Sequence, residues 1–238
     1  MSTRALVGRV AVLVALAATP PGHTLASPKG EPWTTSFTVK EGELKTVGAN
    51  RYFILRPGYR LTLEGQEHGK AVRLVITVLD ETKVVGGVET RVVEERETNG
   101  DVPLEISRNY FAISTRTNDI FYFGEDVDTY KHGKLAGHGG GWHHGAENAR
   151  FGLAMPGAPT VGSRYYQEQA PDVAMDRAQV ISLSERVTTP AGVFTECLKT
   201  KETSPLEPFA KEDKLYAPGI GLIRDGSLSL VLHGPVEP

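Results

Sequence analysis

The chain has 238 residues, of which 23% are charged and 39% hydrophobic, and its formal net charge is −3. The charges are mixed in sign, so no basic tract or patch favours a nucleic-acid partner. The single cysteine, Cys197, excludes a disulfide within the chain, and stability must therefore come from a packed core. Its segment, Val193–Lys199, alternates apolar and polar residues, which predicts a buried strand thiol rather than a nucleophile.

The N-terminal segment has the three-part pattern of a secretory signal peptide. Arg4 and Arg9 precede an apolar run over 10–18, which is followed by a Pro-Pro-Gly break and by Thr24–Ala26, a sequence that suits signal peptidase. The run is too short for a stop-transfer helix, and no second long apolar run predicts a membrane span. We therefore expect removal of residues 1–26 and a periplasmic or extracellular location. The mature chain would carry a net charge of −5, because the removed segment holds two arginines and no acidic residue.

Apolar and polar residues alternate with period two in several later segments, which is typical of half-buried strands. Three such faces consist of Tyr59, Leu61 and Leu63; of Val72, Leu74, Ile76 and Val78; and of Leu228, Leu230 and Leu232. Turn signals follow at close spacing, among them Gly86-Gly87, Asn99-Gly100 and Asp225-Gly226, and these dipeptides suit antiparallel hairpins. The pattern predicts an antiparallel meander.

The expected fold class is all-β: a single antiparallel β-barrel, half-barrel or sandwich over 35–238, because a sheet of this many strands must curl or close. Residues 27–34 are expected to form a flexible lead-in. The best helical segment, Pro171–Gln179, is short and could start as a helical turn before a strand over 178–187. Residues 135–162 form the longest stretch without a strand pattern, and we expect an ordered loop lying over the sheet.

Several phrases of the chain resemble those of exported bacterial β-proteins. They are Asn50–Tyr59, Tyr122–Asp126, Met155–Gly157, Tyr165–Glu168, Thr189–Phe194, Pro205–Pro208 and Tyr216–Gly221. The portion from Pro190 to Gly221 is also similar to the end of secreted half-barrel proteins of lipoprotein-carrier shape. The resemblance implies a curved antiparallel sheet, and it transfers no activity because these phrases are turn-and-strand motifs rather than catalytic signatures.

The window from Gly137 to Gly145 holds three of the seven histidines, His138, His143 and His144, among glycines. Imidazole is the commonest metal ligand, so the window indicates a transition-metal site for zinc or copper. Adjacent side chains on a strand point to opposite faces, so the window needs a partner from a neighbouring strand, which could be Glu125, Asp126 or Asp128. The spacing matches no established zinc motif, and the alternative is a solvated polar loop.

A second constellation suits acid–base chemistry. Glu168 lies beside Tyr166 in the sequence, and an inward-facing, desolvated Glu168 would have a raised pKa and could act as a general acid or base. Together with Tyr166 it would fit a carbohydrate-active lyase or hydrolase that acts on a saccharide. The alternative is that both residues are structural. The chain lacks a Gly-x-Ser-x-Gly elbow, which makes nucleophilic hydrolysis the less favoured chemistry, and it lacks a phosphate-binding loop, so nucleotide binding is set aside.

Three functions remain open from the sequence. The first is an exported binding protein with a small-ligand or transition-metal site under the Gly/His-rich loop, since curved sheets enclose concave surfaces. The second is the metal-assisted or acid–base carbohydrate-active enzyme, and the third is an envelope structural module. The sequence identifies neither the ligand nor the oligomeric state. Six aromatic residues lie close together in the sequence and could line the mouth of a barrel: Phe111, Phe121, Tyr122, Phe123, Tyr130 and Trp142. Aromatic residues at alternating positions are, however, more often part of the core.

Overall fold

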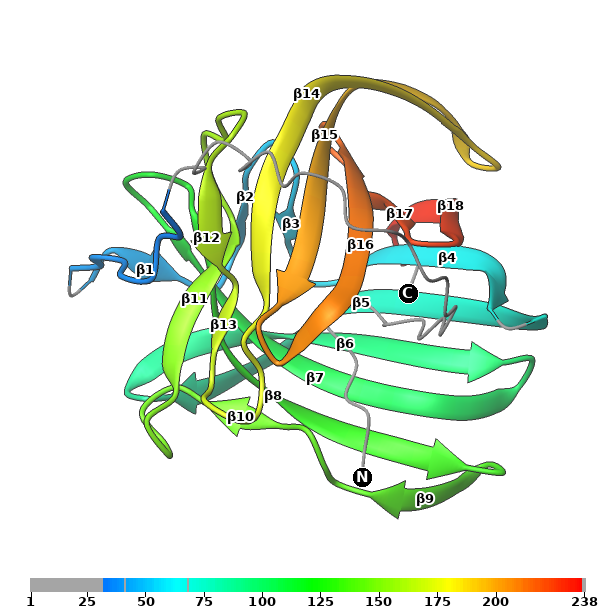
Figure 1. Ribbon diagram of the computed structural model, residues 1–238, viewed down its shortest axis with the longest axis horizontal. Helices are drawn as coiled ribbons and strands as arrows, with labels where there is room; N and C mark the ends of the chain where they lie inside the picture. The colour runs from blue at the N-terminus through cyan, green and yellow to red at the C-terminus, as the bar shows by residue number, and fades with distance from the viewer. Residues whose placement is uncertain (1–31, 41, 68, 237–238) are drawn as a thin grey trace, which may run out of the picture.

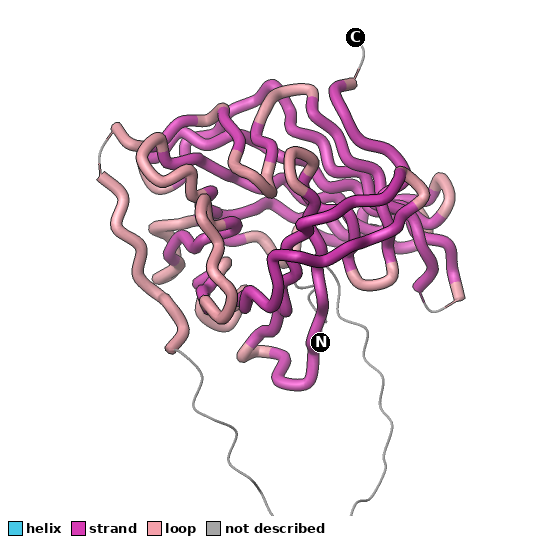
Figure 2. Tube along the Cα trace, turned by 90° about the horizontal axis from the view of Figure 1, so that it is seen from above, coloured by secondary structure: helices cyan, strands magenta, loops and turns pink. Residues whose placement is uncertain are grey.

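A computed structural model of the protein describes residues 32–40, 42–67 and 69–236. This part of the chain consists of strands joined by turns and loops, without helices, as Figure 2 shows. It contains no helix that is long and apolar enough to cross a membrane. The all-β class is thus confirmed. The expected signal peptide, residues 1–26, lies outside the described residues, as does most of the lead-in.

Of the eighteen strands in the described residues, sixteen belong to one sheet in which neighbouring strands are antiparallel, and the other two form a separate small sheet. The strands are β1 (Leu44–Lys45), β2 (Gly48–Ala49), β3 (Ile54–Leu55), β4 (Tyr59–Glu67), β5 (Lys70–Val85), β6 (Val88–Asn99), β7 (Val102–Ser114), β8 (Ile120–Lys131), β9 (Lys134–Gly137), β10 (Trp142–His143), β11 (Arg150–Met155), β12 (Arg164–Tyr166), β13 (Glu168–Gln169), β14 (Arg177–Thr189), β15 (Gly192–Ser204), β16 (Glu207–Ala217), β17 (Gly221–Asp225) and β18 (Leu228–Pro235).

Two runs of hairpins build the sheet. Strands β4 to β8 pair in sequence, strands β14 to β18 do the same, and β18 pairs with β4 to join the two runs. Figure 1 shows the second run, β14 to β16, crossing the first at a steep angle, so that the sheet curls around its own interior. The glycine turns expected from the sequence connect these strands, and Gly86, Gly100 and Gly226 have φ values of 57°, 58° and 51°.

The two ends of the sheet meet at Gln167. The strand order begins with β12 and ends with β13, and these two strands are consecutive in the chain with Gln167 between them. Gln167 and Glu168 both donate their backbone N–H to the carbonyl oxygen of Asp176, at 2.8 and 3.1 Å. A single bend of the chain therefore brings both edges of the sheet together, and the sheet is nearly closed into a barrel.

One end of the barrel is covered by residues 48–55, a segment that we call the strap. It contains the small sheet formed by β2 and β3. The side-chain amide of Asn50 donates to the carbonyl oxygens of Asn118, Met155 and Pro156, and the Tyr52 hydroxyl donates to the carbonyl oxygen of Glu196 at 3.0 Å. The strap is thus attached to opposite sides of the barrel by side-chain hydrogen bonds.

Three sequence expectations need correction. Residues 135–162 are not one loop over the sheet, because β9, β10 and β11 lie within 134–155 and all pair with β8. Residues 171–173 form a turn instead of a helical start, and the following strand begins at Arg177. Leu232 is 62% exposed although Leu228 and Leu230 are buried, because the register shifts after Leu230 and turns Leu232 to the outer face.

We expect Gly152→Ala to destabilise the barrel closure. A Cβ at this position would lie 2.2 Å from the carbonyl oxygen of Gln167, so β11 or the closing bend would have to shift. Urea unfolding should show a loss of about 1–3 kcal/mol in the free energy of unfolding. Gly139→Ala is the matched control, because a Cβ there meets no atom within 4 Å. Equal stability of the two variants would show that close approach at Gly152 does not limit closure.

Candidate functional site

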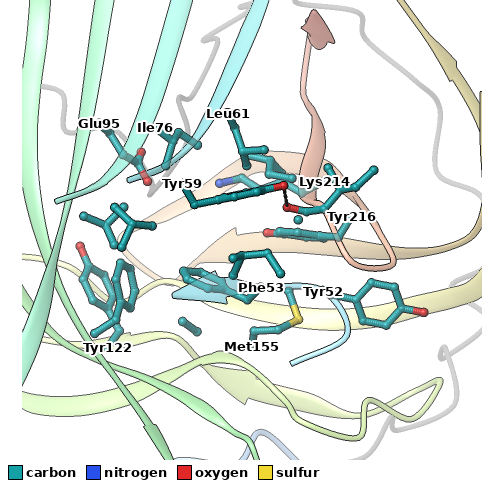
Figure 3. Close-up of a pocket in the computed structure, with 18 of the residues that line it drawn as sticks. Tyr52, Phe53, Tyr59, Leu61, Ile76, Glu95, Tyr122, Met155, Lys214 and Tyr216 are labelled. Atoms are coloured by element: carbon teal, nitrogen blue, oxygen red, sulfur yellow. Dashed lines mark hydrogen bonds between the residues drawn. The ribbon is translucent and has the colours of Figure 1, made fainter. Parts of the chain in front are cut away.

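A cavity of about 90 Å³ lies between the strap and the inner face of the sheet. Its wall is mostly apolar and includes Phe53, Leu61, Ile76, Val93, Phe111 and Met155. The cavity also has a polar side, where Glu95, Gln167 and Lys214 line it together with Tyr59, Tyr122 and Tyr216. Figure 3 shows the Glu95 carboxyl directed inward near Ile76, with Lys214 beside Tyr59. The Tyr59 hydroxyl donates to the carbonyl oxygen of Ile220 at 3.0 Å.

A bulge in β8 places Glu125 inside the barrel. Asn109 of β7 is opposite Glu125, whereas Phe111, two residues further along β7, is opposite Tyr122, so β8 carries one more residue than β7 between these pairs. Gly124 lies in this bulge with φ 140°. Tyr122 and Glu125 consequently share the inner face although they are three residues apart. The Tyr122 hydroxyl donates to the side-chain oxygen of Asn109.

Lys214 is held between two carboxylates. Its Nζ lies 3.3 Å from Oε2 of Glu202 and 3.7 Å from Oδ2 of Asp225, and the three side chains are all at least nine-tenths buried. Glu202 also accepts a hydrogen bond from Nε2 of Gln167 at 3.1 Å. Burial opposes the charge on Lys214, but the neighbouring carboxylates Asp225 and Glu202 outweigh it and raise the pKa of the ammonium group well above its ordinary value.

Three other carboxyl groups of the barrel interior have raised pKa values, which favours their neutral forms. Burial raises the pKa of Glu95 to about 7, since the charge of Lys214 only partly offsets it. Burial and the nearby Glu105 carboxyl raise the pKa of Glu125 to about 8. The pKa of Glu168 is raised well above its ordinary value by burial and by the Asp176 carboxyl. The barrel interior therefore holds more carboxyl groups than it can keep ionised near neutral pH.

Several hydrogen-bond acceptors here have no partner among the described residues. Gln167 is 7% exposed, and while its Nε2 donates to Glu202, its Oε1 accepts nothing. Glu168 is 1% exposed; its Oε2 accepts from Trp142 Nε1 at 3.1 Å, whereas its Oε1 has no partner. Glu95 makes no hydrogen bond or ion pair with a side chain in the described ranges. Buried polar atoms are normally paired, so these unpaired atoms distinguish the barrel interior, and two of the three residues, Glu95 and Gln167, line the cavity.

The predicted metal ligands lie in separate places. His143 Nε2 is 2.9 Å from Asp126 Oδ1 on the outer face, where Lys83 Nζ is 2.8 Å from the other carboxylate oxygen. The Tyr110 hydroxyl also donates to Asp126. Burial works against the charged form of Asp126, but the hydrogen bonds from Lys83 and Tyr110 outweigh it and lower the pKa of this carboxyl. Glu125, the next residue along the strand, faces the interior.

The other two histidines of the window have different neighbours. His138 Nδ1 is 2.6 Å from Oδ1 of Asp128 at the exposed edge of the sheet. His144 packs against Phe123 and Phe151, and its Nδ1 accepts the backbone N–H of Phe151 at 3.3 Å. Within residues 32–40, 42–67 and 69–236, no three His, Cys, Asp or Glu side chains are grouped so that they could hold a metal ion. The window thus supplies pairs with carboxylates rather than a shared site.

The two predicted catalytic residues also face different surroundings. Tyr165 is buried opposite Ala178, which has no exposed surface, so the next residue, Tyr166, points to the other side of β12. There Tyr166 lies against the ring of Trp33 and accepts a hydrogen bond from Arg177 at 3.4 Å. Glu168 faces the interior beside Trp142. The expected desolvation and raised pKa of Glu168 are present, but its side-chain hydrogen-bond partner is Trp142, whereas that of Tyr166 is Arg177.

The charged and amide side chains on the polar side of the cavity, Glu95, Gln167 and Lys214, were not singled out by the sequence patterns. Glu95 follows the buried Val93 by two residues, and Lys214 precedes the buried Tyr216 by two residues. A charged residue two positions from a buried one lies on the same face of a strand, so this spacing could have indicated that Glu95 and Lys214 point inward. Gln167 carries no such signal, because its position follows from the meeting of β12 and β13.

Comparison with protein-family models, with curated proteins and with solved structures gave no match. The chemistry of the cavity is therefore interpreted from its own geometry.

We expect the stability of the protein to fall as the pH rises from about 5.5 to 9. A carboxyl whose pKa is raised in the folded state stabilises the fold below its unfolded pKa, near 4.5, and this contribution is lost as the pH rises through the folded value. Glu95 and Glu125 titrate at about 7 and 8, so the loss falls in this window. Glu125→Gln should flatten the profile and be more stable than the parent at pH 9 by about 1–3 kcal/mol.

Chemical denaturation at several pH values measures this effect. Glu94→Gln serves as the control, because Glu94 lies on the opposite face of β6 from Glu95 and pairs with Arg96 and Arg108. Its profile should run parallel to that of the parent. An unchanged slope in Glu125→Gln would contradict a proton-bound Glu125 in the folded state.

Proposed function

We propose that this protein binds a small molecule with a largely apolar body in the cavity between the strap and the inner face of the barrel. The supporting observation is a cavity of about 90 Å³ with aromatic and aliphatic walls and a few polar groups on one side. A volume of roughly 10–15 Å³ by this kind of measure holds one water, so the cavity offers several times that space. Apolar pockets with a few convergent polar groups are typical of small-molecule sites.

The aromatic part of the wall favours an apolar ligand body over structural water. Phe111 stacks on Tyr122 with ring centroids 4.6 Å apart, and Phe53 lies 5.2 Å from Phe111. These rings offer apolar contact and little hydrogen bonding, whereas an ordered water needs two to four polar partners. Transfer of an apolar ligand from water to this wall would contribute about 25 cal/mol for each Å² of apolar surface buried.

The proposal keeps the small-ligand part of the first sequence hypothesis and moves its site from the Gly/His-rich window to the barrel interior. The enzyme alternative gains no support, because Tyr166 and Glu168 face opposite sides of the chain. The structural-module alternative corresponds to a cavity that binds nothing, and the experiment below distinguishes it.

We expect Ala154→Phe to abolish binding of a single-ring alcohol such as benzyl alcohol. Ala154 lines the cavity, so a phenyl ring at this position would occupy the ligand's space. Ligand that binds the folded state raises the unfolding temperature, and the parent should show this increase together with a saturable calorimetric signal. Ala71→Phe places the same ring on an exposed residue of β5 and should leave binding intact.

Absence of any signal with the parent protein would remove the ligand-binding proposal and favour the structural module. Binding that survives in Ala154→Phe would place the ligand elsewhere on the protein.

A further inference from the structure

The cavity wall offers more hydrogen-bond acceptors than donors. The carboxyl of Glu95 has no hydrogen-bond or ion-pair partner among the described side chains, and the Oε1 atom of Gln167 accepts no hydrogen bond. Gln167 is 7% exposed, so its orphaned oxygen cannot be compensated by bulk solvent. The Tyr59 hydroxyl, which also lines the cavity, uses its proton on the carbonyl oxygen of Ile220. A ligand that satisfies this wall must bring donors.

Lys214 does not balance this excess. Its ammonium group already lies 3.3 Å from Glu202 and 3.7 Å from Asp225, and both carboxylates are buried with it. An anionic ligand would therefore compete with two carboxylates for one cation. It would also face Glu95 on the same wall, and unpaired like charges in a buried site are costly.

We propose that the ligand is an organic ammonium compound, with an apolar body among Phe53, Ile76 and Phe111 and a protonated primary amine directed at the Glu95 carboxyl. An ammonium group has three donors and no acceptor, which complements a carboxyl group that has no other hydrogen-bond partner among the described side chains. Hydrogen bonds that join a charged donor to a carboxylate are about twice as strong as neutral ones. This inference rests on the proposed function, since it specifies the ligand of the same cavity.

A metal ion fits the wall less well than an amine. Metal binding needs several ligand atoms that converge on one point, and no three His, Cys, Asp or Glu side chains do so in the part of the chain that the structure describes. The apolar and aromatic remainder of the wall offers no ligand to a metal, whereas it suits the carbon body of an amine.

The ionisation of Glu95 gives the proposal a pH dependence. Burial raises its pKa to about 7, and the charged groups that face it are Lys214 on β16, Asp225 on β17, Glu105 on β7 and Glu202 on β15. An alkyl ammonium stays protonated between pH 6 and 8, as a lysine side chain does. Its affinity should fall as the pH drops below 7 and Glu95 takes up a proton, because the neutral carboxyl no longer attracts the cation.

The test compares three probes of equal size by calorimetry on the full chain at pH 8: benzylamine, benzyl alcohol and benzoate. We expect benzylamine to bind about tenfold or more tightly than benzyl alcohol, and benzoate to bind most weakly. Glu95→Gln should reduce the advantage of the amine over the alcohol to less than about threefold while leaving the affinity for the alcohol unchanged. The control, Glu94→Gln, changes the neighbouring residue on the outer face and should keep the full preference.

The outcomes separate the two proposals. Binding of benzyl alcohol or benzoate at least as tightly as benzylamine would overturn the amine inference and leave the cavity a ligand site of another class. The same conclusion follows if Glu95→Gln retains the preference, or if the affinity for benzylamine is equal at pH 6 and pH 8. Failure of all three probes to bind would overturn the ligand-binding function itself. The probe and pH comparisons use the parent protein, so they decide the question even where a variant fails to fold.

Discussion

The closure of the sheet at Gln167 is the constraint on which the rest of the molecule depends. A curled sheet leaves two edges with unpaired backbone groups, and such edges invite pairing with other chains. Here the edge strands β12 and β13 are neighbours in sequence. The bend between them brings both edges to the backbone carbonyl oxygen of Asp176, which accepts the N–H groups of Gln167 and Glu168. The bend also directs the Gln167 side chain inward, where it reaches Glu202. The same residue thereby joins the sheet and forms part of the cavity wall.

The interior divides into an apolar part and a carboxyl-rich part, and the second is unusual for a folding core. Burying an ionised carboxylate without a partner costs several kcal/mol, so these groups either pair or bind a proton. Glu202 and Asp225 use the ammonium of Lys214, while Glu125 and Glu168 favour the neutral form. Such an arrangement contributes little to stability compared with an apolar core of the same volume.

Much of the fold could be predicted from the sequence, because period-two alternation and Asn-Gly or Asp-Gly turns are local signals. The exceptions came from register shifts, which turn a residue to the other face without changing the local pattern, as at Leu232 and Gly124. The candidate site was harder to predict from the sequence than the fold. The histidine window drew attention because it is unusual in composition, yet its side chains form separate pairs at the edge of the sheet. Glu95, Gln167 and Lys214 come from distant segments, and their proximity depends on how the barrel closes.

The attachment of the strap has a consequence for how the interior exchanges with its surroundings. Tyr52 and Phe53 form part of the cavity wall, yet their segment belongs to a separate two-stranded sheet and does not pair with the barrel strands. Displacing it breaks the hydrogen bonds of Asn50 and Tyr52 and leaves the sixteen-stranded ladder intact. Local opening of this kind costs less than global unfolding. A guest would enter and leave at this end of the barrel only as fast as the strap gives up these hydrogen bonds, the backbone hydrogen bond from Gly219 to Arg51 and the burial of Tyr52 and Leu55.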